Sequence, residues 1–297
     1  MLASLDAESS FKTTFAEASE VLGYDLWAIV RNGPEELLNS TELTQPAMLV
    51  AGLAVWRLWL ERGGAPPAAV AGHSLGDFSA LVCAGVLEFA AAVALVRTRG
   101  KLMNEAVPPG SGLMAAVLGL SDEDVAAACA EAAQGEVVEP VNFNSPSQVV
   151  IAGEAGAVKR ALEVAKARGA KRAVPLPVSV PCHSALMQAA AARFAGALRE
   201  VPLKSPGITY LSSVDAQPYS DPAAIRDVLE RQLASPVRWT DTIRALSARG
   251  VTQVIECGPG KVLTGLNRRI ERRPDLQFLA IDDLASIDAA RALTTGS

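Results

Sequence analysis

The stretch Gly72-His73-Ser74-Leu75-Gly76 decides how this chain is interpreted. A short apolar run, residues 68–71, precedes it, and residues 77–84 after it have the pattern of a helix. A serine between two glycines at a strand-to-helix turn is the pattern of a nucleophile elbow, and this context favours it over a chance Gly-Ser loop. We expect both glycines to be required, because the turn is too sharp for side chains on either side of the serine. The next helix directs unpaired N–H groups at this point, so the N–H of Leu75 is the predicted oxyanion donor.

The composition limits the class of protein. The 297 residues are half apolar, enough to bury the core of one large domain or two. The net charge of −5 is opposite to the basic excess of nucleic-acid binders. No apolar run approaches the roughly 18–20 residues that span a bilayer, and the N-terminus lacks a signal-peptide pattern. The four cysteines have neither paired nor metal-ligand spacing. These features predict a soluble protein of a reducing compartment, the cytoplasm, that binds no nucleic acid, membrane or metal. We also expect a monomer.

The alternation of strands and helices, with short Gly and Pro punctuation, predicts an α/β protein. In the middle third the predicted order is strand, helix, strand, strand, helix, strand, which is that of a ferredoxin-like unit. We therefore expect an α/β-hydrolase-like large domain with a central parallel sheet and an inserted ferredoxin-like small subdomain. Pro-rich hinges lie at residues 108–110 and 175–181. The predicted boundaries are 1–109 and 179–297 for the two parts of the large domain, and 110–178 for the subdomain.

The expected elements follow from the same patterns. One helix is expected to begin after Thr44-Gln45-Pro46 and to end before Gly63-Gly64. The predicted helices cover residues 47–61, 76–84, 89–105, 121–133 and 154–168. The predicted strands cover residues 68–71, 113–118, 137–143, 148–152, 170–178, 207–211 and 251–256.

A serine nucleophile needs a base, and the chain contains two histidines. His73 adjoins Ser74 on a tight turn, where neighbouring side chains diverge, so we expect it to be structural. His183 lies in a loop where the inserted unit rejoins the large domain, and it is the predicted base. A lone histidine is more often a satisfied structural residue, but the elbow favours the catalytic interpretation. Its second ring nitrogen requires an acceptor, either a carboxylate or a backbone carbonyl, and spacing selects neither.

Arg99 is surrounded by apolar residues on its predicted helix, at positions 95, 96, 102 and 103. An unpaired buried charge is costly, so this guanidinium needs an anionic partner. The structural alternatives are an internal ion pair or an arginine that extends to solvent. The functional alternative is a planar fork that binds a substrate carboxylate through two hydrogen bonds.

Six motifs occur in an order that resembles one enzyme family. They are Gly72-His73-Ser74-Leu75-Gly76, Ser79-Ala80-Leu81, Arg99-Gly100-Lys101, Asn142-Phe143-Asn144-Ser145-Pro146, Pro177-Val178-Ser179-Val180-Pro181-Cys182-His183 and Gly258-Pro259-Gly260-Lys261-Val262-Leu263. The chain resembles the bacterial malonyl-CoA:acyl-carrier-protein transacylases of type II fatty acid synthesis, and the resemblance covers nearly all of it.

The resemblance implies transfer of malonyl from malonyl-CoA to the pantetheine thiol of holo acyl carrier protein, through a malonyl ester of Ser74. It implies that His183 is the base and that the main-chain carbonyl of Gln232 orients it. It also implies that Arg99 pairs with the free malonate carboxylate, and that Asn142 and Asn144 line the cleft. No cofactor is implied, because the coenzyme A thioester is itself the substrate.

The chain departs from the family pattern in three places. Members begin with a strand and a Phe-Pro-Gly-Gln-Gly-Ser-Gln segment, and this sequence opens on residues resembling those that follow it. The usual Glu-Tyr after the elbow is Asp77-Phe78, and Cys182 stands where serine is usual. Two alternatives therefore stand beside malonyl transfer: a serine esterase or thioesterase, and a catalytically impaired form that lacks this segment and its oxyanion donor.

Because acyl carrier proteins are acidic, docking requires a local basic patch. One candidate cluster belongs to the predicted subdomain and a second lies near the C-terminus. The subdomain cluster, which we favour, comprises Lys159, Arg160, Lys166, Arg168, Lys171 and Arg172. The C-terminal cluster comprises Arg268, Arg269, Arg272 and Arg273.

Overall fold

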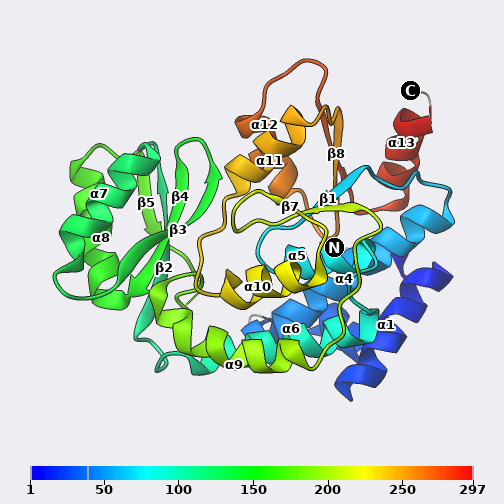
Figure 1. The fold of residues 1–297 in the computed structure, drawn as a ribbon, viewed down its shortest axis with the longest axis horizontal. Coiled ribbons are helices and arrows are strands. Elements are labelled where there is room, and N and C mark those ends of the chain that lie inside the picture. Colours follow the sequence, from blue (N-terminus) through cyan, green and yellow to red (C-terminus); the bar gives the residue numbers. More distant parts are fainter. Residues whose placement is uncertain (1, 39, 179, 296–297) are drawn as a thin grey trace.

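The computed structural model describes residues 2–38, 40–178 and 180–295 (Figure 1). It has a smaller lobe, at the left of Figure 1, that contains strands β2 to β5 and helices α7 and α8. The remaining elements form the larger lobe. Because the chain enters the smaller lobe once and leaves it once, the smaller lobe is an insertion, as predicted. The exact boundaries 1–109, 110–178 and 179–297 stay a prediction.

The larger lobe contains parallel strands in two separate sheets. Strand β1 (Ala69–Ala71) pairs in parallel with β6 (Thr209–Leu211), and the short β7 (Pro218–Tyr219) pairs antiparallel with β6. Strands β8 (Gln253–Cys257) and β9 (Gln277–Ile281) form their own parallel pair. The predicted parallel pairing is therefore confirmed, but among the described residues it is divided between two sheets.

Helices cover the sheets of the larger lobe, and many of their apolar residues are buried in one continuous core. The first half of the chain supplies η1 (Ala3–Leu5), α1 (Ser9–Leu22), α2 (Leu26–Asn32), α3 (Glu35–Leu38), α4 (Thr41–Glu61), α5 (Gly76–Cys83) and α6 (Phe89–Glu105). The second half supplies η2 (Ala185–Met187), α9 (Gln188–Arg199), α10 (Pro222–Gln232), α11 (Trp239–Ala248), α12 (Val262–Ile270) and α13 (Leu284–Thr295).

Helix α4 differs from its prediction in two respects. It begins at Thr41 rather than at residue 47, so the expectation that it starts after Pro46 was wrong. A proline near the start of a helix removes only one backbone donor, and Pro46 is buried against the core. The helix is also long and apolar enough to cross a membrane by length and composition, contrary to the expectation of no such run. Because 72% of its most apolar window is buried inside the fold, it has the environment of a core helix.

The smaller lobe has the predicted ferredoxin-like topology. Its four-stranded antiparallel sheet has the spatial order β3-β4-β2-β5. In chain order the elements are β2 (Gly112–Leu118), α7 (Asp122–Ala133), β3 (Val138–Ser145), β4 (Gln148–Glu154), α8 (Ala155–Ala167) and β5 (Arg172–Pro175). Ser121 caps α7, its hydroxyl accepting a hydrogen bond from the Asp124 N–H at 3.1 Å. Strand β5 is shorter than the predicted 170–178, because Pro175 and Pro177 cannot donate to a ladder.

The two faces of this sheet pack against different partners. Helices α7 and α8 cover one face around a core that includes Val117, Val149 and Ile151. The opposite face carries Met114, Val141, Val150 and Ala152, which pack with Cys182 of the larger lobe. Strand β3 is fastened to the larger lobe by two backbone hydrogen bonds, Phe143 N–H to Val237 O at 2.9 Å and Val237 N–H to Val141 O at 2.8 Å. The smaller lobe therefore turns an apolar face toward the loop that carries His183.

Candidate active site

The elbow lies between the end of β1 and the start of α5. Ser74 has a φ of 53°, so the predicted nucleophile occupies the left-handed region. A Cβ at position 72 would lie 1.8 Å from the backbone carbon of Gly76, so glycine is required there. At Gly76 an added Cβ would meet nothing within 4 Å, so the expectation that both glycines are required was wrong. Of the two glycines, only Gly72 lies too close to neighbouring backbone to carry a side chain, and the left-handed residue of the turn is Ser74.

Ser74 and His183 are brought together although 109 residues separate them. The Ser74 Oγ lies 2.7 Å from the His183 Nε2. His183 follows the smaller lobe in sequence and is itself left-handed, with a φ of 66°. Its backbone N–H donates to the Leu233 carbonyl at 3.0 Å, which fixes the loop against the end of α10. His183 is 4% exposed.

Two backbone carbonyls hold the other nitrogen of His183. The Nδ1–H lies 3.0 Å from both the Gln232 O and the Ser235 O. Two acceptors at Nδ1 place the proton there, which leaves Nε2 free to accept the proton of the Ser74 hydroxyl. Burial and then the positive charge of Arg99 lower the pKa of His183 to about 3, so the ring is neutral at pH 7. Of the two kinds of acceptor that the sequence left open, this site contains carbonyls.

Arg99 is buried on α6, with an exposed fraction of 1%. One terminal nitrogen donates to the Gln45 Oε1 at 2.8 Å. The other lies 3.2 Å from both the Ser74 Oγ and the Gln232 Oε1, and Nε has no hydrogen-bond partner. Burial lowers the pKa of Arg99 to about 10, so it stays charged at pH 7. No carboxylate of the described residues forms an ion pair with it, so neutral groups hold a charge beside the serine.

Two side chains that the sequence analysis did not select belong to this network. Gln45 accepts from Arg99 and, from its Nε2, lies 3.2 Å from the Met103 sulfur. Asp77 is buried beneath the elbow, where the Gln232 Nε2 and the Ser213 Oγ each donate to its Oδ2 at 2.7 Å. A polar residue within an apolar helix was the available signal for Gln45. No spacing in the sequence joins Asp77 to Gln232.

The remaining predicted site residues surround this centre. The His73 Nε2 lies 2.8 Å from the Asn144 Oδ1, so His73 contacts the smaller lobe rather than the serine hydroxyl. Burial lowers the pKa of His73 as well. Asn142 is buried where β3 bridges to Val237, and no hydrogen bond joins its side chain to Ser74. Among the described residues, no carbonyl accepts from the Leu75 N–H, which leaves this donor available beside Ser74.

Cys182, beside His183, has its thiol 3.3 Å from the Val180 carbonyl. Burial raises the pKa of this thiol to about 11, so it is protonated at pH 7. Across the described parts of the chain, no group of three or more His, Cys, Asp or Glu side chains could hold a metal ion. The arrangement is therefore suited to acyl transfer through Ser74, with a neutral base and a fixed positive charge in reach.

Comparison with known proteins identifies the family. The model of the acyl transferase domain matches residues 3–274. The chain is 55% identical over 277 residues to the malonyl CoA-acyl carrier protein transacylase of Salmonella typhimurium, covering 93% of this chain and 89% of that protein. The chain belongs to the malonyl CoA-acyl carrier protein transacylase family. A relative of the same name from Bacillus subtilis is 44% identical over 280 residues, covering 94% of this chain and 87% of that protein.

Solved structures of similar proteins have the same fold. An acyl carrier protein S-malonyltransferase from Vibrio cholerae superposes with a TM-score of 0.94 at 57% identity, covering 97% of this chain and 94% of that chain. A malonyl-transacylase in complex with its type II PKS acyl-carrier protein superposes with a TM-score of 0.96 at 53% identity, covering 99% and 94%. The predicted α/β class and the predicted acyltransferase activity are confirmed.

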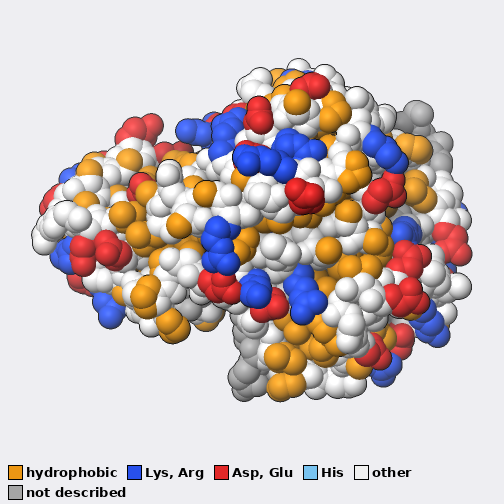
Figure 2. Space-filling view, turned by 60° about the horizontal axis from the view of Figure 1, so that its bottom comes forward, with side chains coloured by type: hydrophobic (Ala, Val, Ile, Leu, Met, Phe, Trp, Pro, Cys, Tyr) orange, Lys and Arg blue, Asp and Glu red, His pale blue; other side chains and the backbone are white. Residues whose placement is uncertain are grey.

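Basic side chains are distributed over both lobes. Figure 2 shows Lys and Arg interleaved with Asp and Glu over most of one face, with several basic groups near the junction of the lobes. Within the favoured subdomain cluster, three members form ion pairs: Arg160 with Glu136, Lys166 with Glu163, and Arg168 with Glu131. Lys159, Arg160 and Lys166 lie on α8, which covers the sheet face opposite Cys182. That this cluster docks a partner stays a prediction.

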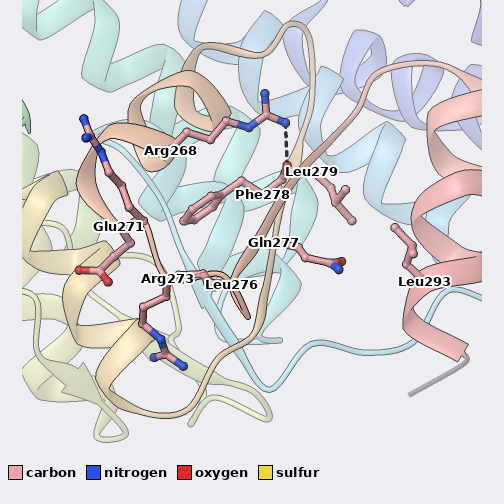
Figure 3. A pocket seen from close by; sticks show the side chains of 9 residues that line it. Arg268, Glu271, Arg273, Leu276, Gln277, Phe278, Leu279 and Leu293 are labelled. Atoms are coloured by element: carbon pink, nitrogen blue, oxygen red, sulfur yellow. Dashed lines mark hydrogen bonds between the residues drawn. The ribbon is translucent and has the colours of Figure 1, made fainter.

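The C-terminal cluster borders a separate hollow of about 460 Å³ (Figure 3). Arg268 donates to the Phe278 carbonyl at 3.1 Å there, and Arg273 pairs with Asp275. The lining residues come from α12, the connection to β9, β9 itself and α13, and none belongs to the site around Ser74. Arg269 lies elsewhere, donating to the Gln148 side chain at the β3–β4 turn at 2.8 Å.

Proposed function

We propose that this chain transfers the malonyl group of malonyl-CoA to the pantetheine thiol of holo acyl carrier protein, supplying chain-extender units for fatty acid synthesis. The names of its relatives support this substrate and this acceptor. One observation of the site carries the proposal. The buried Arg99 is held by neutral groups, and one of its terminal nitrogens lies 3.2 Å from the Ser74 Oγ, so it can bind the anionic group of a substrate there. Malonyl thioesters present such an anion close to the reacting carbonyl.

In the first half of the reaction, Ser74 Oγ attacks the thioester carbonyl while the His183 Nε2 takes the hydroxyl proton. The Leu75 N–H donates to the oxygen on which negative charge develops. The carbon–sulfur bond then breaks, and His183 returns its proton to the leaving thiolate of coenzyme A. The product is a malonyl ester on Ser74.

In the second half, the pantetheine thiol of the carrier protein replaces coenzyme A. The His183 Nε2 takes the thiol proton, the sulfur attacks the ester carbonyl, and the Ser74 oxygen leaves with the proton returned by His183. The carbonyls of Gln232 and Ser235 keep the ring in one tautomer through both halves. The low pKa of His183 keeps it unprotonated between the halves. No cofactor takes part in this proposal.

Arg99 accounts for selection of the malonyl group. Its planar fork can accept a carboxylate by two parallel hydrogen bonds, and no acidic side chain of the described residues competes for it. Asn142 and Asn144 are proposed to line the same cleft from the smaller lobe. An acetyl thioester has no carboxylate, so it leaves the buried guanidinium without its anion.

The test is the ratio of kcat/KM for malonyl-CoA to that for acetyl-CoA in the loading step. We expect Arg99→Ala to lower this ratio roughly 10- to 100-fold, because a charge-assisted hydrogen bond contributes about 1.5–3 kcal/mol. Arg99→Lys is the matched control: it retains the charge, loses the fork and should give an intermediate ratio. An unchanged ratio in Arg99→Ala would refute Arg99 as the carboxylate-binding residue.

Two other functions make different predictions for the protein mixed with malonyl-CoA alone. A transferase accumulates a malonyl adduct on Ser74 that mass spectrometry detects and that added carrier protein removes. A serine esterase or thioesterase releases malonate without carrier protein. A catalytically impaired form gives neither adduct nor malonate. The water-excluding burial of His183 and Arg99 favours the transferase.

A further inference from the structure

Asp77 has no part in the proton transfers described above, yet its carboxyl group is fully buried under the elbow. Its Oδ2 accepts two hydrogen bonds of 2.7 Å, from the Ser213 Oγ and from the Gln232 Nε2. The buried hydroxyl of Tyr210 and the backbone N–H of Ser213 also lie beside this carboxyl group. A buried carboxyl is costly, so its position requires a reason.

The hydrogen bonds of Gln232 supply that reason. Its amide nitrogen donates to two acceptors, the Ser74 carbonyl at 3.0 Å and the Asp77 Oδ2 at 2.7 Å. Its amide oxygen therefore points the other way and accepts from Arg99 at 3.2 Å. Turning the amide over would place its NH₂ group against the guanidinium and its oxygen against two acceptors. All three contacts would become repulsive, so only one orientation satisfies the site.

Gln232 is also where the two halves of the site meet. Its side chain contacts Arg99, while its main-chain carbonyl accepts from His183 Nδ1 at 3.0 Å. The Ser74 carbonyl fixes one hydrogen of the amide, and the Asp77 carboxyl fixes the second. Removing Asp77 leaves the amide with one anchor and leaves one buried N–H unsatisfied.

We propose that Asp77 is a positioning residue that orients the Gln232 amide so that its oxygen faces Arg99, and thereby sets the guanidinium that receives the acyl carboxylate. The inference rests on the proposed role of Arg99. It assigns Asp77 to substrate selection rather than to proton transfer.

The experiment measures kcat and KM for loading from malonyl-CoA and from acetyl-CoA in Asp77→Ala, Asp77→Asn and Ser213→Ala. In Asp77→Ala we expect the KM for malonyl-CoA to rise roughly tenfold, with acetyl-CoA loading changed less than about threefold, the effect of one lost buried hydrogen bond. Asp77→Asn should stay within about threefold of the parent, because its oxygen can still accept from Gln232 while its NH₂ faces the Tyr210 hydroxyl. Ser213→Ala removes the other hydrogen bond to the same oxygen and should leave the malonyl-to-acetyl ratio unchanged.

Equal losses for the two thioesters in Asp77→Ala would overturn the proposal, since a merely structural role lowers both. If Asp77→Ala does not fold, Asp77→Leu, Gln232→Met and the double variant Asp77→Leu, Gln232→Met keep the test open, because leucine removes the acceptor and fills the same space. The substitution at position 77 should have no further effect on the ratio once the Gln232 amide is gone, and additive effects would overturn the proposal. Arg99→Ala, measured in parallel, separates the two hypotheses. An unchanged ratio there refutes the role of Arg99, whereas a changed ratio there with no effect in Asp77→Ala refutes only the role of Asp77.

Discussion

The catalytic loops of the larger lobe and the sheet of the smaller lobe differ in backbone conformation and in how many charged groups they bury. Ser74 and His183 occupy left-handed backbone conformations, and Arg99, Asp77 and His183 are buried polar or charged groups. In the smaller lobe, β2 and β4 pair without interruption from Gly112↔Glu154 to Leu118↔Gln148. No charged side chain is fully buried among the described residues of that lobe.

The larger lobe supplies the groups that react, and the smaller lobe supplies structural support beside them. Residues in the left-handed region, and buried charges, each cost stability and persist only where surrounding structure holds them. The larger lobe concentrates both around one serine hydroxyl. The smaller lobe contributes an apolar face, the contact of Asn144 with His73 and a wall beside His183. Its β2–β4 ladder is regular, whereas β3 shifts register against β4 on either side of Phe143. Left-handed residues also occur away from Ser74, at Gln134, Ser147 and Ala216, so it is their combination with buried polar and charged groups that marks the functional site.

Changes at Ser74 should have the largest effect and test whether its conformation is strained for function. We expect Ser74→Ala to abolish malonyl loading while the protein stays folded. Ser74→Gly should also abolish loading and raise the free energy of unfolding by about 1 kcal/mol, because glycine accepts a φ of 53° without a Cβ penalty. Radiolabel incorporation and urea unfolding measure the two quantities. Covalent label on Ser74→Ala, or a Ser74→Gly protein less stable than Ser74→Ala, would contradict this account.

The two histidines provide the next comparison. His183→Ala should lower the rate of loading by roughly two to four orders of magnitude, the range for losing a general base. His73→Ala removes the contact with Asn144 and should lower the rate far less. Single-turnover loading, compared at matched stability, measures both variants. If the two effects were reversed, the assignment of the base would be wrong.

The pH dependence of stability should differ in sign between two buried groups. The folded-state pKa of His183, about 3, lies below its ordinary value of 6.5, so folded-state stability is lost as pH falls from about 6.5 toward 3. The pKa of Asp77 is raised by burial from 3.8 to about 7, so its contribution is lost as pH rises through that interval. His183→Ala should therefore weaken the destabilisation between pH 6.5 and 5. Asp77→Asn should strengthen it.

Urea unfolding at several pH values between 4 and 8 measures these slopes. Each variant serves as the control of the other, because their effects on the slope are opposite. Parallel curves for the parent and both variants would show that neither group changes its pKa on folding.

Variants of the basic clusters should show the smallest effects. They test which of the two clusters binds carrier protein. Lys159 and Lys171 form no ion pair with another described residue, so we expect charge reversal at both to raise the KM for carrier protein several-fold and to flatten its salt dependence. Loading from malonyl-CoA should stay unchanged. Charge reversal at Lys166 should raise this KM less, because Glu163 already compensates part of its charge. An effect confined to Arg268, Arg269, Arg272 and Arg273 would move the docking surface to α12.

Local sequence determined a large part of this protein. The elbow, the cap at Ser121 and the ferredoxin-like order of elements depend on residues close together in the chain, and each is confirmed in the fold. The apolar neighbours of Arg99 correctly indicated a buried guanidinium, because helical periodicity places them on its own face. Helix α1 and strand β9 have no counterpart among the predicted elements. Strand β9 depends on pairing with β8 rather than on a strong local pattern.

Only the tertiary structure decided most of the hydrogen-bond partners within the site. The resemblance implied the Gln232 carbonyl as an acceptor of His183, but not the second acceptor, the Ser235 carbonyl. That contact, the support of Arg99 by Gln45 and the contact between Asp77 and Gln232 join residues 52, 54 and 155 positions apart. The two sheets of the larger lobe and the conformation of Ser74 were likewise beyond local pattern. The physical reason is that periodicity and turn chemistry act over a few residues. Hydrogen-bond partners and buried charges depend on which distant segments packing brings together.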